Sequence, residues 1–357
     1  MKINEQLSDK NIFMLVDGFG QGGIQQAYLI LIEEYVSIFN SVTLIVAQKS
    51  SSDLGLPLSN NLNVINLNSG KLFDIKAIRH LRKLLVNLKP QFVISNMYRS
   101  QIWSAIVCTR SSKLIWVEQN TYITRKKSQW LLMRLLSKKV EKIVCISNEV
   151  KTLTNKKLNQ SNKTVVIPNP IRAPRGSISV LSRANDFIFV GRMIPQKNPE
   201  LMIESFSYFI KKFNTNSKLH LVGDGELTNS LKELSYNLGV LEKCFFHGWL
   251  SNQDTNKLMN KCKTLVSTSH IEGMALVRFE ALANGCCVVT TDTGGSKQYL
   301  SPEENIGTFV VEHEMSTISS KMYDSLDSKY WSEKLILKRG HLVSPFNPLR
   351  IASELIS

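Results

Sequence analysis

Short apolar runs rich in β-branched residues alternate with amphipathic segments along most of the chain. The short runs favour strands over buried helices, and the alternation is typical of βαβ units on parallel sheets. The predicted strands are "NIFMLV", "VTLIVA", "FVISN", "KLIWVE", "KIVCIS" and "TVVIPNP" in the first half, then "DFIFVG", "KLHLVG", "CFFHGW", "TLVSTS", "CCVVTT" and "GTFVV" in the second.

A break in this pattern divides the chain. The stretch "IPNPIRAPRGSIS" is rich in proline and glycine, which resist a continued helix or strand, so it predicts a linker. We therefore expect an α/β protein with two doubly wound parallel-sheet domains. The predicted segments are residues 1–170, residues 171–342, and a C-terminal helix within 343–357 that could return to the first domain.

The positive charge lies in the first half of the chain. Of the net charge of +15, residues 1–172 contribute +14 and residues 173–357 contribute +1. Such asymmetry suggests a negatively charged partner, such as nucleic acid, an anionic membrane or a phosphorylated substrate. Nucleic acid is disfavoured, because the basic residues are not interleaved with aromatic stacking platforms.

Several classes of protein are disfavoured by composition. No apolar run approaches the ~18 residues of a membrane span, and the apolar core from Ile12 to Val16 is too short for a signal peptide, so we expect a cytoplasmic protein. The six cysteines form no CxxC pair and predict buried free thiols. Scattered histidines and the lack of an Asp-x-Asp motif predict no metal site and no cofactor.

The turn "DGFGQGG" matches G-x-G-x-x-G through Gly18, Gly20 and Gly23, and it lies between a predicted strand and a predicted helix. Glycines there let backbone amides approach a phosphate at the helix N-terminus. A nicotinamide cofactor would also need an acidic residue after the second strand, where the chain has Gln48 and Lys49. The motif therefore predicts phosphate proximity, with a tight turn that binds no ligand as the alternative.

Two further loops follow predicted strands. In "VGRMIPQKNPE", Arg192 and Lys197 stand before a predicted helix, where two cations suit a diphosphate. In "LVGDGE", Gly223 and Gly225 form a turn at the carboxyl end of a strand, where α/β sheets bind ligands. A solvated surface loop and a plain turn are the respective alternatives.

The stretch "HIEGMALVRFEALANG" carries a carboxylate near each end of an apolar run. Glu272 is predicted in a loop after a strand, and Glu280 on a helix over residues 274–284. Carboxylates accept hydrogen bonds from sugar hydroxyls, and the free amides of the first helical turn would point into the same crevice. The alternative is a structural pairing with Arg278.

Residues 124–142 predict an amphipathic helix with cations on one side and Trp130 at the border. Such a helix could bind anionic lipid or pack on its own domain. The predicted cationic side holds Lys127, Arg134 and Lys138, and the opposite side holds Leu131, Leu132, Leu135, Leu136 and Val140.

In this order, the motifs resemble the retaining glycosyltransferases called group 1 or family 4. The most specific element is the spacing of Glu272 and Glu280, with "VGR" and Lys197 upstream. The resemblance implies the GT-B fold, in which two Rossmann-like domains face a cleft that holds the donor. It rests on "GGIQQAYLILIEEY", "CISNEV", "VIPNPI", "FVGRMIPQKNPELMIESF", "LVGDGEL", "FFHGWL", "EGMALVRFEALANG" and "CVVTTDTGG".

The resemblance also implies roles for single residues. Arg192 and Lys197 would grip the diphosphate and stabilise its leaving charge in place of a metal. Glu272 would contact the donor sugar and Glu280 the ribose, and same-face attack would retain the anomeric configuration. The other implied nucleotide-sugar contacts are Gly22, Gly23, Gly223, Gly248 and Trp249 (the last two at the base), Gly273, Met274, Ala275 and Leu276.

One position departs from the family pattern. Many members carry a histidine on the acceptor side, where this chain has Gln119 between Glu118 and Asn120. Glutamine cannot act as a general base at neutral pH, and Glu118 is the possible substitute.

The resulting hypothesis is a transferase that moves a hexose or N-acetylhexosamine from a nucleotide-sugar, with UDP as the expected nucleotide. The acceptor would be a lipid-linked or lipopolysaccharide glycan of a bacterial surface polysaccharide, such as O-antigen or capsule. The protein would act peripherally at the inner face of the cytoplasmic membrane. A nucleotide-sugar epimerase on the same fold is one alternative, and an NAD(P)-dependent oxidoreductase is another.

Overall fold

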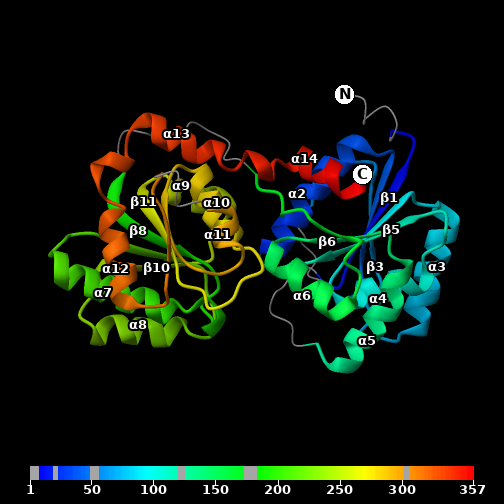
Figure 1. Ribbon diagram of the computed structural model, residues 1–357, viewed down its shortest axis with the longest axis horizontal. Helices are drawn as coiled ribbons and strands as arrows, with labels where there is room; N and C mark the ends of the chain where they lie inside the picture. The colour runs from blue at the N-terminus through cyan, green and yellow to red at the C-terminus, as the bar shows by residue number, and fades with distance from the viewer. Residues whose placement is uncertain (1–7, 19–22, 49–55, 120–124, 173–182, 301–305) are drawn as a thin grey trace. The chain divides into compact units, whose positions relative to one another are not determined.

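The computed structural model describes residues 8–18, 23–48, 56–119, 125–172, 183–300 and 306–357. The chain forms two compact units, each built around its own parallel sheet (Figure 1). Unit 1 comprises residues 1–170 and 346–357, and unit 2 comprises residues 171–345. The predicted α/β class with two doubly wound parallel-sheet domains is confirmed.

The sheet of unit 1 has seven parallel strands in the order β3-β2-β1-β4-β5-β6-β7. Helices α2 and α14 cover one face, and α3, α4, α5 and α6 cover the other (Figure 1). Coverage on both faces explains why the central strands are almost wholly apolar. The strands are β1 (Asn11–Val16), β2 (Ser41–Val46), β3 (Leu62–Asn66), β4 (Phe92–Asn96), β5 (Lys113–Glu118), β6 (Lys142–Cys145) and β7 (Thr164–Val166), and the helices are α2 (Gly23–Ile38), α3 (Ile75–Leu88), α4 (Tyr98–Val107), α5 (Lys127–Leu136), α6 (Asn148–Leu158) and α14 (Pro348–Ile356).

The sheet of unit 2 has six parallel strands in the order β10-β9-β8-β11-β12-β13. Helices α7, α8 and α12 pack on one face around an aromatic core, and α9, α10 and α13 lie on the other (Figure 1). The strands are β8 (Ala184–Val190), β9 (Leu219–Val222), β10 (Cys244–Gly248), β11 (Cys262–Ser267), β12 (Cys287–Thr291) and β13 (Thr308–Val311), and the helices are α7 (Pro199–Phe213), α8 (Thr228–Asn237), α9 (Asn252–Met259), α10 (Leu276–Ala283), α11 (Ser296–Tyr299), α12 (Met315–Asp324) and α13 (Glu333–His341).

The C-terminal helix α14 packs on α2 in unit 1. Its apolar side joins the core of that unit through Ile351, Ala352 and Leu355. The Tyr35 hydroxyl donates a hydrogen bond of 3.1 Å to the carbonyl of Ala352, and the Lys142 ammonium donates one of 3.1 Å to the carbonyl of Glu354. A cation at the carbonyl end of a helix also opposes the partial negative charge there, which stabilises this arrangement.

The strand β3 was not among the predicted strands. It lies at the edge of the sheet, and three of its five residues are exposed. An edge strand with little buried surface has a weak hydrophobic pattern, so it was not predicted.

The cysteines and the helices bear on two other predictions. All six cysteines are free thiols, and five of them are buried, as predicted. None of the helices in the described part of the chain combines the length and the apolar character that crossing a membrane requires.

Candidate functional site

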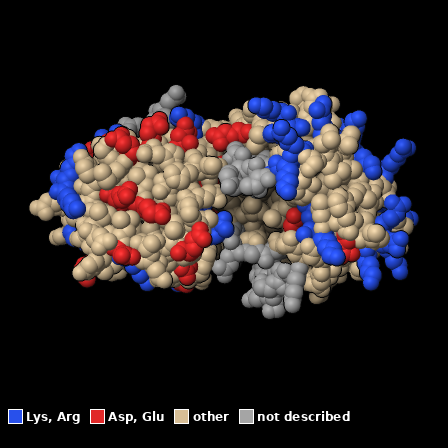
Figure 2. Space-filling model, turned by 90° about the horizontal axis from the view of Figure 1, so that it is seen from below, with Lys and Arg blue, Asp and Glu red and all other residues tan. Residues whose placement is uncertain are grey.

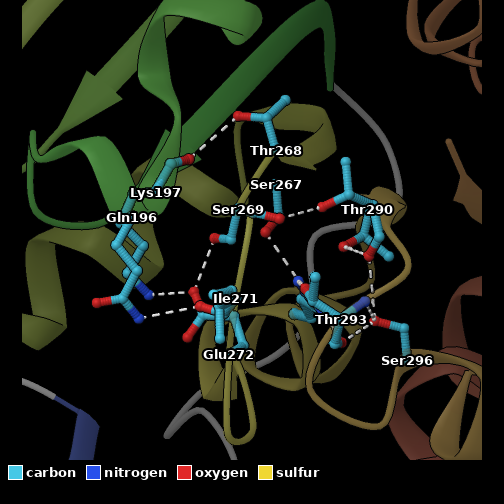
Figure 3. A network of polar contacts seen from close by, with 12 residues as sticks. Gln196, Lys197, Ser267, Thr268, Ser269, Ile271, Glu272, Thr290, Thr293 and Ser296 are labelled. Carbon is cyan, nitrogen blue, oxygen red and sulfur yellow. Dashed lines mark hydrogen bonds and ion pairs between the residues drawn. The ribbon is translucent and has the colours of Figure 1, made fainter. Parts of the chain in front are cut away.

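Two loops at the carboxyl ends of adjacent strands in unit 2 are joined by hydrogen bonds. Residues 191–198 follow β8, and residues 268–273 follow β11, its neighbour in the sheet. The backbone amide of His270 donates to the carbonyl of Gln196 at 3.0 Å, and the Gln196 amide group donates to the carbonyl of Ile271 at 2.9 Å. The Thr268 hydroxyl donates to the carbonyl of Asn198 at 2.7 Å. These bonds fix one loop against the other (Figure 3).

The joined loops bring Lys197 and Glu272 together. The Lys197 ammonium lies 2.5 Å from Oε1 of Glu272, and the Ser269 hydroxyl donates to the same oxygen at 2.7 Å (Figure 3). The side chains are 20% and 9% exposed, so the pair is largely desolvated. The sequence predicted both residues as site residues but not their ion pair, which joins positions 75 residues apart.

The turn after β12 packs against Glu272. Gly294 has φ +58°, and a Cβ added there would lie 2.6 Å from the Cβ of Glu272. A side chain at this position would therefore collide with the glutamate, and the backbone conformation also favours glycine. The stretch "CVVTTDTGG" contributes to the family resemblance, but no role was predicted for Gly294.

Arg192 differs from Lys197 in its surroundings. Its side chain is exposed, and it makes no hydrogen bond or ion pair with another described residue. The loop therefore presents one cation that is paired with a carboxylate and one that is open to a ligand. This arrangement suits an anion that carries more than one charge.

Glu280 is the unpaired carboxylate of the site. It lies on α10 and is partly exposed, and its carboxylate forms no hydrogen bond or ion pair with any other residue that the structure describes. Desolvation by the surrounding protein raises the pKa of its carboxyl group to about 7. Arg278 does not pair with it, because the Arg278 guanidinium bonds to Ser267, Thr293 and Ser296. The structural alternative is therefore wrong for Glu280, and an unpaired carboxylate in a largely buried place is available to a ligand.

Helix α10 begins two residues later than predicted, at Leu276, with Ala275 at its N-cap. No side chain caps this helix start. Met274, Ala275 and Leu276 are each at most 7% exposed, and Gly273 is partly exposed. The uncapped amides of the first turn are consequently free to bind an acceptor atom of a ligand.

The glycines of "LVGDGE" allow this turn to pack closely against the backbone of the loop after β8. Gly223 has φ +120°, and a Cβ there would lie 2.0 Å from the carbonyl oxygen of Gly191, while a Cβ on Gly225 would lie 2.4 Å from that of Met193. The Gly223 amide donates to the carbonyl of Gly248 at 2.7 Å. These glycines thus support the loop that carries Arg192.

Trp249, the residue after β10, is 48% exposed. The preceding Gly248 has φ +64°, and a Cβ there would meet nothing within 4 Å. The chain therefore leaves the strand in a left-handed turn and presents a large aromatic surface, which a flat ring could stack on.

The predicted acceptor-side residues lie in unit 1. Glu118 is 2% exposed, and both of its oxygens are held by the Arg125 guanidinium, at 3.1 and 3.2 Å. Gln119 is buried, and its side-chain oxygen accepts a hydrogen bond of 2.8 Å from Asn169. Because Glu118 is already ion-paired, we no longer regard it as a candidate base. Asn120 lies outside the described residues.

The glycine-rich turn is described in part. Gly23 is exposed at the first position of α2, and Gly18 follows β1, whereas Gly20 and Gly22 lie outside the described residues. The helix itself forms as predicted from the apolar pattern.

The helix predicted over residues 124–142 is shorter than expected and turns a different side to the protein. It runs as α5 from Lys127 to Leu136, and a 3-10 turn follows. Trp130 and Met133 are buried, whereas Leu131 and Leu135 are 60% and 56% exposed. The prediction of a leucine side packed away from the cations is therefore wrong, because the exposed surface of α5 mixes both kinds of side chain. The three cations that the sequence predicted on one side, Lys127, Arg134 and Lys138, are all exposed.

Family models match nearly the whole chain. Residues 22–175 match the model for glycosyltransferase family 4, and residues 175–336 match the model for glycosyl transferases group 1. The chain belongs to the group 1 glycosyltransferases.

Two relatives and one structural neighbour illustrate the range of this glycosyltransferase family. An uncharacterized glycosyltransferase of Methanocaldococcus jannaschii is 32% identical over 37% of the chain, and the match spans 33% of that relative. The UDP-Gal:alpha-D-GlcNAc-diphosphoundecaprenol alpha-1,3-galactosyltransferase of Escherichia coli is 26% identical over 77% of the chain and 76% of its own length. The Anabaena protein HepE, solved with UDP, is similar in structure over 97% of this chain and 98% of the HepE chain. The TM-score is 0.80 and the sequence identity is 15%. The predicted GT-B fold is confirmed.

No described group of three or more His, Cys, Asp or Glu side chains in this glycosyltransferase is arranged to hold a metal ion. The loop after β8 contributes two cations to the described site, Arg192 and Lys197.

Proposed function

We propose that this glycosyltransferase transfers a hexose or N-acetylhexosamine from a nucleotide-sugar, with UDP as the nucleotide, to a lipid-linked glycan. The observation that carries the donor assignment is Glu280, a largely desolvated carboxylate without a described partner, on the helix that follows the Lys197–Glu272 pair. A ribose diol supplies two hydroxyl donors for such a carboxylate. The ligand UDP of HepE, which shares the fold, supports the choice of nucleotide.

The residues of unit 2 suit the departure of a nucleoside diphosphate. Arg192 and Lys197 would bind the diphosphate and stabilise the charge that builds on it as the glycosidic bond breaks. The uncapped amides at the start of α10 would donate hydrogen bonds to the oxygens of the same diphosphate, and Glu272 would contact the donor sugar. We propose that these groups replace a metal ion and that Trp249 stacks on the base.

We further propose retention of the anomeric configuration. The described part of unit 1 offers no free carboxylate at Glu118, because Arg125 holds both of its oxygens. The leaving phosphate would then take the proton of the attacking hydroxyl on the same face of the sugar. The product configuration, read by the anomeric coupling constant, would be inverted if a base on the opposite face did this work.

The acceptor assignment rests on the relatives. The galactosyltransferase of Escherichia coli acts on a sugar linked to diphosphoundecaprenol. A lipid-linked acceptor places the reaction at a membrane surface, and we propose the inner face of the cytoplasmic membrane, in the biosynthesis of a bacterial surface polysaccharide.

The first experiment is a thermal-shift screen of the protein with nucleotide-sugars, free nucleotides and NAD(P). We expect stabilisation by one nucleotide-sugar and by its nucleotide. The stabilising donor is then incubated with and without a lipid-linked glycan. Transfer that requires the acceptor supports the proposal; conversion of the donor alone would indicate an epimerase, and stabilisation by NAD(P) would indicate an oxidoreductase.

The exposed side of α5 supports the membrane assignment. Exposed Leu131 and Leu135 could enter the interfacial region of a bilayer while the neighbouring cations meet anionic headgroups. Figure 2 shows lysine and arginine side chains gathered over this side of unit 1 with few acidic ones among them. Each cation near an anionic surface contributes about 1 kcal/mol.

Replacing Lys127, Arg134 and Lys138 together with glutamine should weaken binding to vesicles that contain anionic lipid by about 30- to 150-fold, since three such contacts are lost. Co-sedimentation with vesicles measures this. A matched control replaces three exposed lysines of unit 2, Lys211, Lys232 and Lys261, and should leave binding unchanged. If both variants sedimented equally with the vesicles, the exposed side of α5 would face water and would not bind the membrane.

A further inference from the structure

A buried arginine lies between Glu272 and Glu280 in the sequence. Arg278 lies on α10 and is 0% exposed. Its Nη1 donates to the carbonyl of Thr293 at 2.6 Å, and its Nη2 donates to the Thr293 hydroxyl at 2.7 Å. The same guanidinium contacts the hydroxyls of Ser267 and Ser296. It therefore ties the helix to the end of β11 and to the turn after β12.

The turn that Arg278 holds packs directly against Glu272. Gly294, the residue after Thr293, has no room for a Cβ because the Cβ of Glu272 would lie 2.6 Å from it. The Gly294 backbone thus packs directly against the Cβ and the backbone of Glu272. A shift of this turn would be transmitted directly to the position of Glu272.

A second connection runs through hydrogen bonds. The Ser296 hydroxyl, which Arg278 contacts, donates to the carbonyl of Thr293 and lies 3.3 Å from the carbonyl of Thr291. The Thr291 hydroxyl donates to the carbonyl of Ser269 at 2.7 Å, and the Ser269 hydroxyl donates to Glu272 at 2.7 Å. Steric contact and hydrogen bonds therefore both lead from Arg278 to the carboxylate that holds Lys197.

The chemistry of the side chain fits a geometric role. Burying a guanidinium is costly, and an apolar side chain of similar size could fill the same space. The planar guanidinium group provides several hydrogen-bond donors in a fixed geometry, which a lysine cannot reproduce. Here these donors meet acceptors on two separate segments.

We propose that Arg278 is a positioning residue of the donor site: by holding the 293–296 turn, it fixes Glu272 and, through it, Lys197. This proposal rests on the proposed function. Arg278 itself touches neither substrate nor reacting atoms. Its effect on catalysis passes through Glu272.

The test measures the kinetics of variants at Arg278 and Thr293, first in the otherwise wild-type protein and then in a protein in which Glu272 is already replaced. Arg278→Lys should lower kcat at least tenfold and change KM for the nucleotide-sugar less than threefold. Thr293→Val, a milder change that removes one acceptor, should lower kcat in the same direction. In a Glu272→Gln background, both effects should shrink to less than twofold, because residues in one network are not additive.

Arg339→Lys is the matched control. Arg339 is also 0% exposed in unit 2, but it bonds to the carbonyls of Ile306, Gly285 and Tyr330. Its replacement should lower the melting temperature while turnover per folded molecule stays near wild type. A general loss of stability would therefore affect both arginine variants, whereas loss of positioning affects only Arg278.

Hydrogen–deuterium exchange gives a readout that does not need turnover. In Arg278→Lys, the amides of 268–273 and 293–296 should exchange at least fivefold faster, and those of β9 should not change. Unchanged exchange in 268–273, or kinetic effects that stay additive with Glu272→Gln, would overturn the proposal. Failure of wild type to use any nucleotide-sugar would instead contradict the proposed function, while the exchange result still decides whether Arg278 holds the loop.

Discussion

Replacing Lys197 with alanine is expected to lower turnover about 30- to 1000-fold. The change removes one cation from the charge that develops on the leaving diphosphate, and contacts of this kind contribute ~2–4 kcal/mol to the transition state. The loss should appear mainly in kcat, because the charge grows as the bond breaks. Steady-state kinetics with saturating donor measures it, and near-normal turnover would remove Lys197 from the mechanism.

The same substitution also breaks an ion pair. Glu272 is largely buried and would lose the ammonium that lies 2.5 Å away, so Lys197→Ala should also lower the melting temperature. Arg192→Ala separates the two effects, because the exposed Arg192 has no described partner and its loss should reduce turnover with little change in stability. If both variants lost stability equally while turnover per folded molecule was unchanged, the two cations would be structural.

Replacing Glu280 with glutamine is expected to stabilise the ligand-free protein and weaken nucleotide binding. Burial raises the pKa of the Glu280 carboxyl from its ordinary 4.5 to about 7, so between these values the folded state binds more protons than the unfolded state. Stability is therefore lost as the pH rises through this window, by up to about 3 kcal/mol, and less to the extent that the carboxylate keeps contact with water. Glutamine does not ionise and avoids this cost.

Denaturant unfolding at two pH values tests the stability effect. Glu280→Gln should exceed wild type in free energy of unfolding at pH 8 and differ little at pH 4.5, where Glu280 is protonated in the folded state and about half protonated in the unfolded state. Glu233→Gln, on the exposed surface of α8, is the control and should match wild type at both. A Glu280→Gln protein that is no more stable than wild type at pH 8 would contradict the account of its burial.

Glu280→Gln should weaken nucleotide binding, although it stabilises the ligand-free protein. Hydrogen bonds from hydroxyls to a charged acceptor contribute roughly 1.5–3 kcal/mol, so the affinity of Glu280→Gln for UDP should fall by about 10- to 150-fold at pH 8. Wild-type affinity should rise between pH 6 and 8 as Glu280 ionises, and the variant should not show this rise. Calorimetric titration measures both, and parallel pH profiles would exclude Glu280 as the group that binds the ribose.

Much of the fold was predictable because it rests on local patterns. Central strands such as "FVISN" and "KLIWVE" are buried on both faces of a parallel sheet, so almost every residue in them is apolar. The exposed edge strand β3 lacked this signal and was missed. Helix α5 was predicted in the right place, but which of its sides is buried depends on the shape of the surface beneath it. Trp130 and Met133 fill that surface, and Leu131 and Leu135 stay exposed.

The sequence by itself determined the α/β class with two doubly wound domains, the order of the motifs and the spacing of Glu272 and Glu280, because helical and strand periodicity and motif order are properties of neighbouring residues. Only the tertiary structure decided that Lys197 pairs with Glu272, that Gly294 backs this glutamate, that Arg278 turns away from Glu280, and that Glu280 is desolvated. These contacts join the carboxyl ends of strands that are adjacent in the sheet but far apart in the chain. They depend on strand order and on the depth of each side chain, which no local pattern encodes.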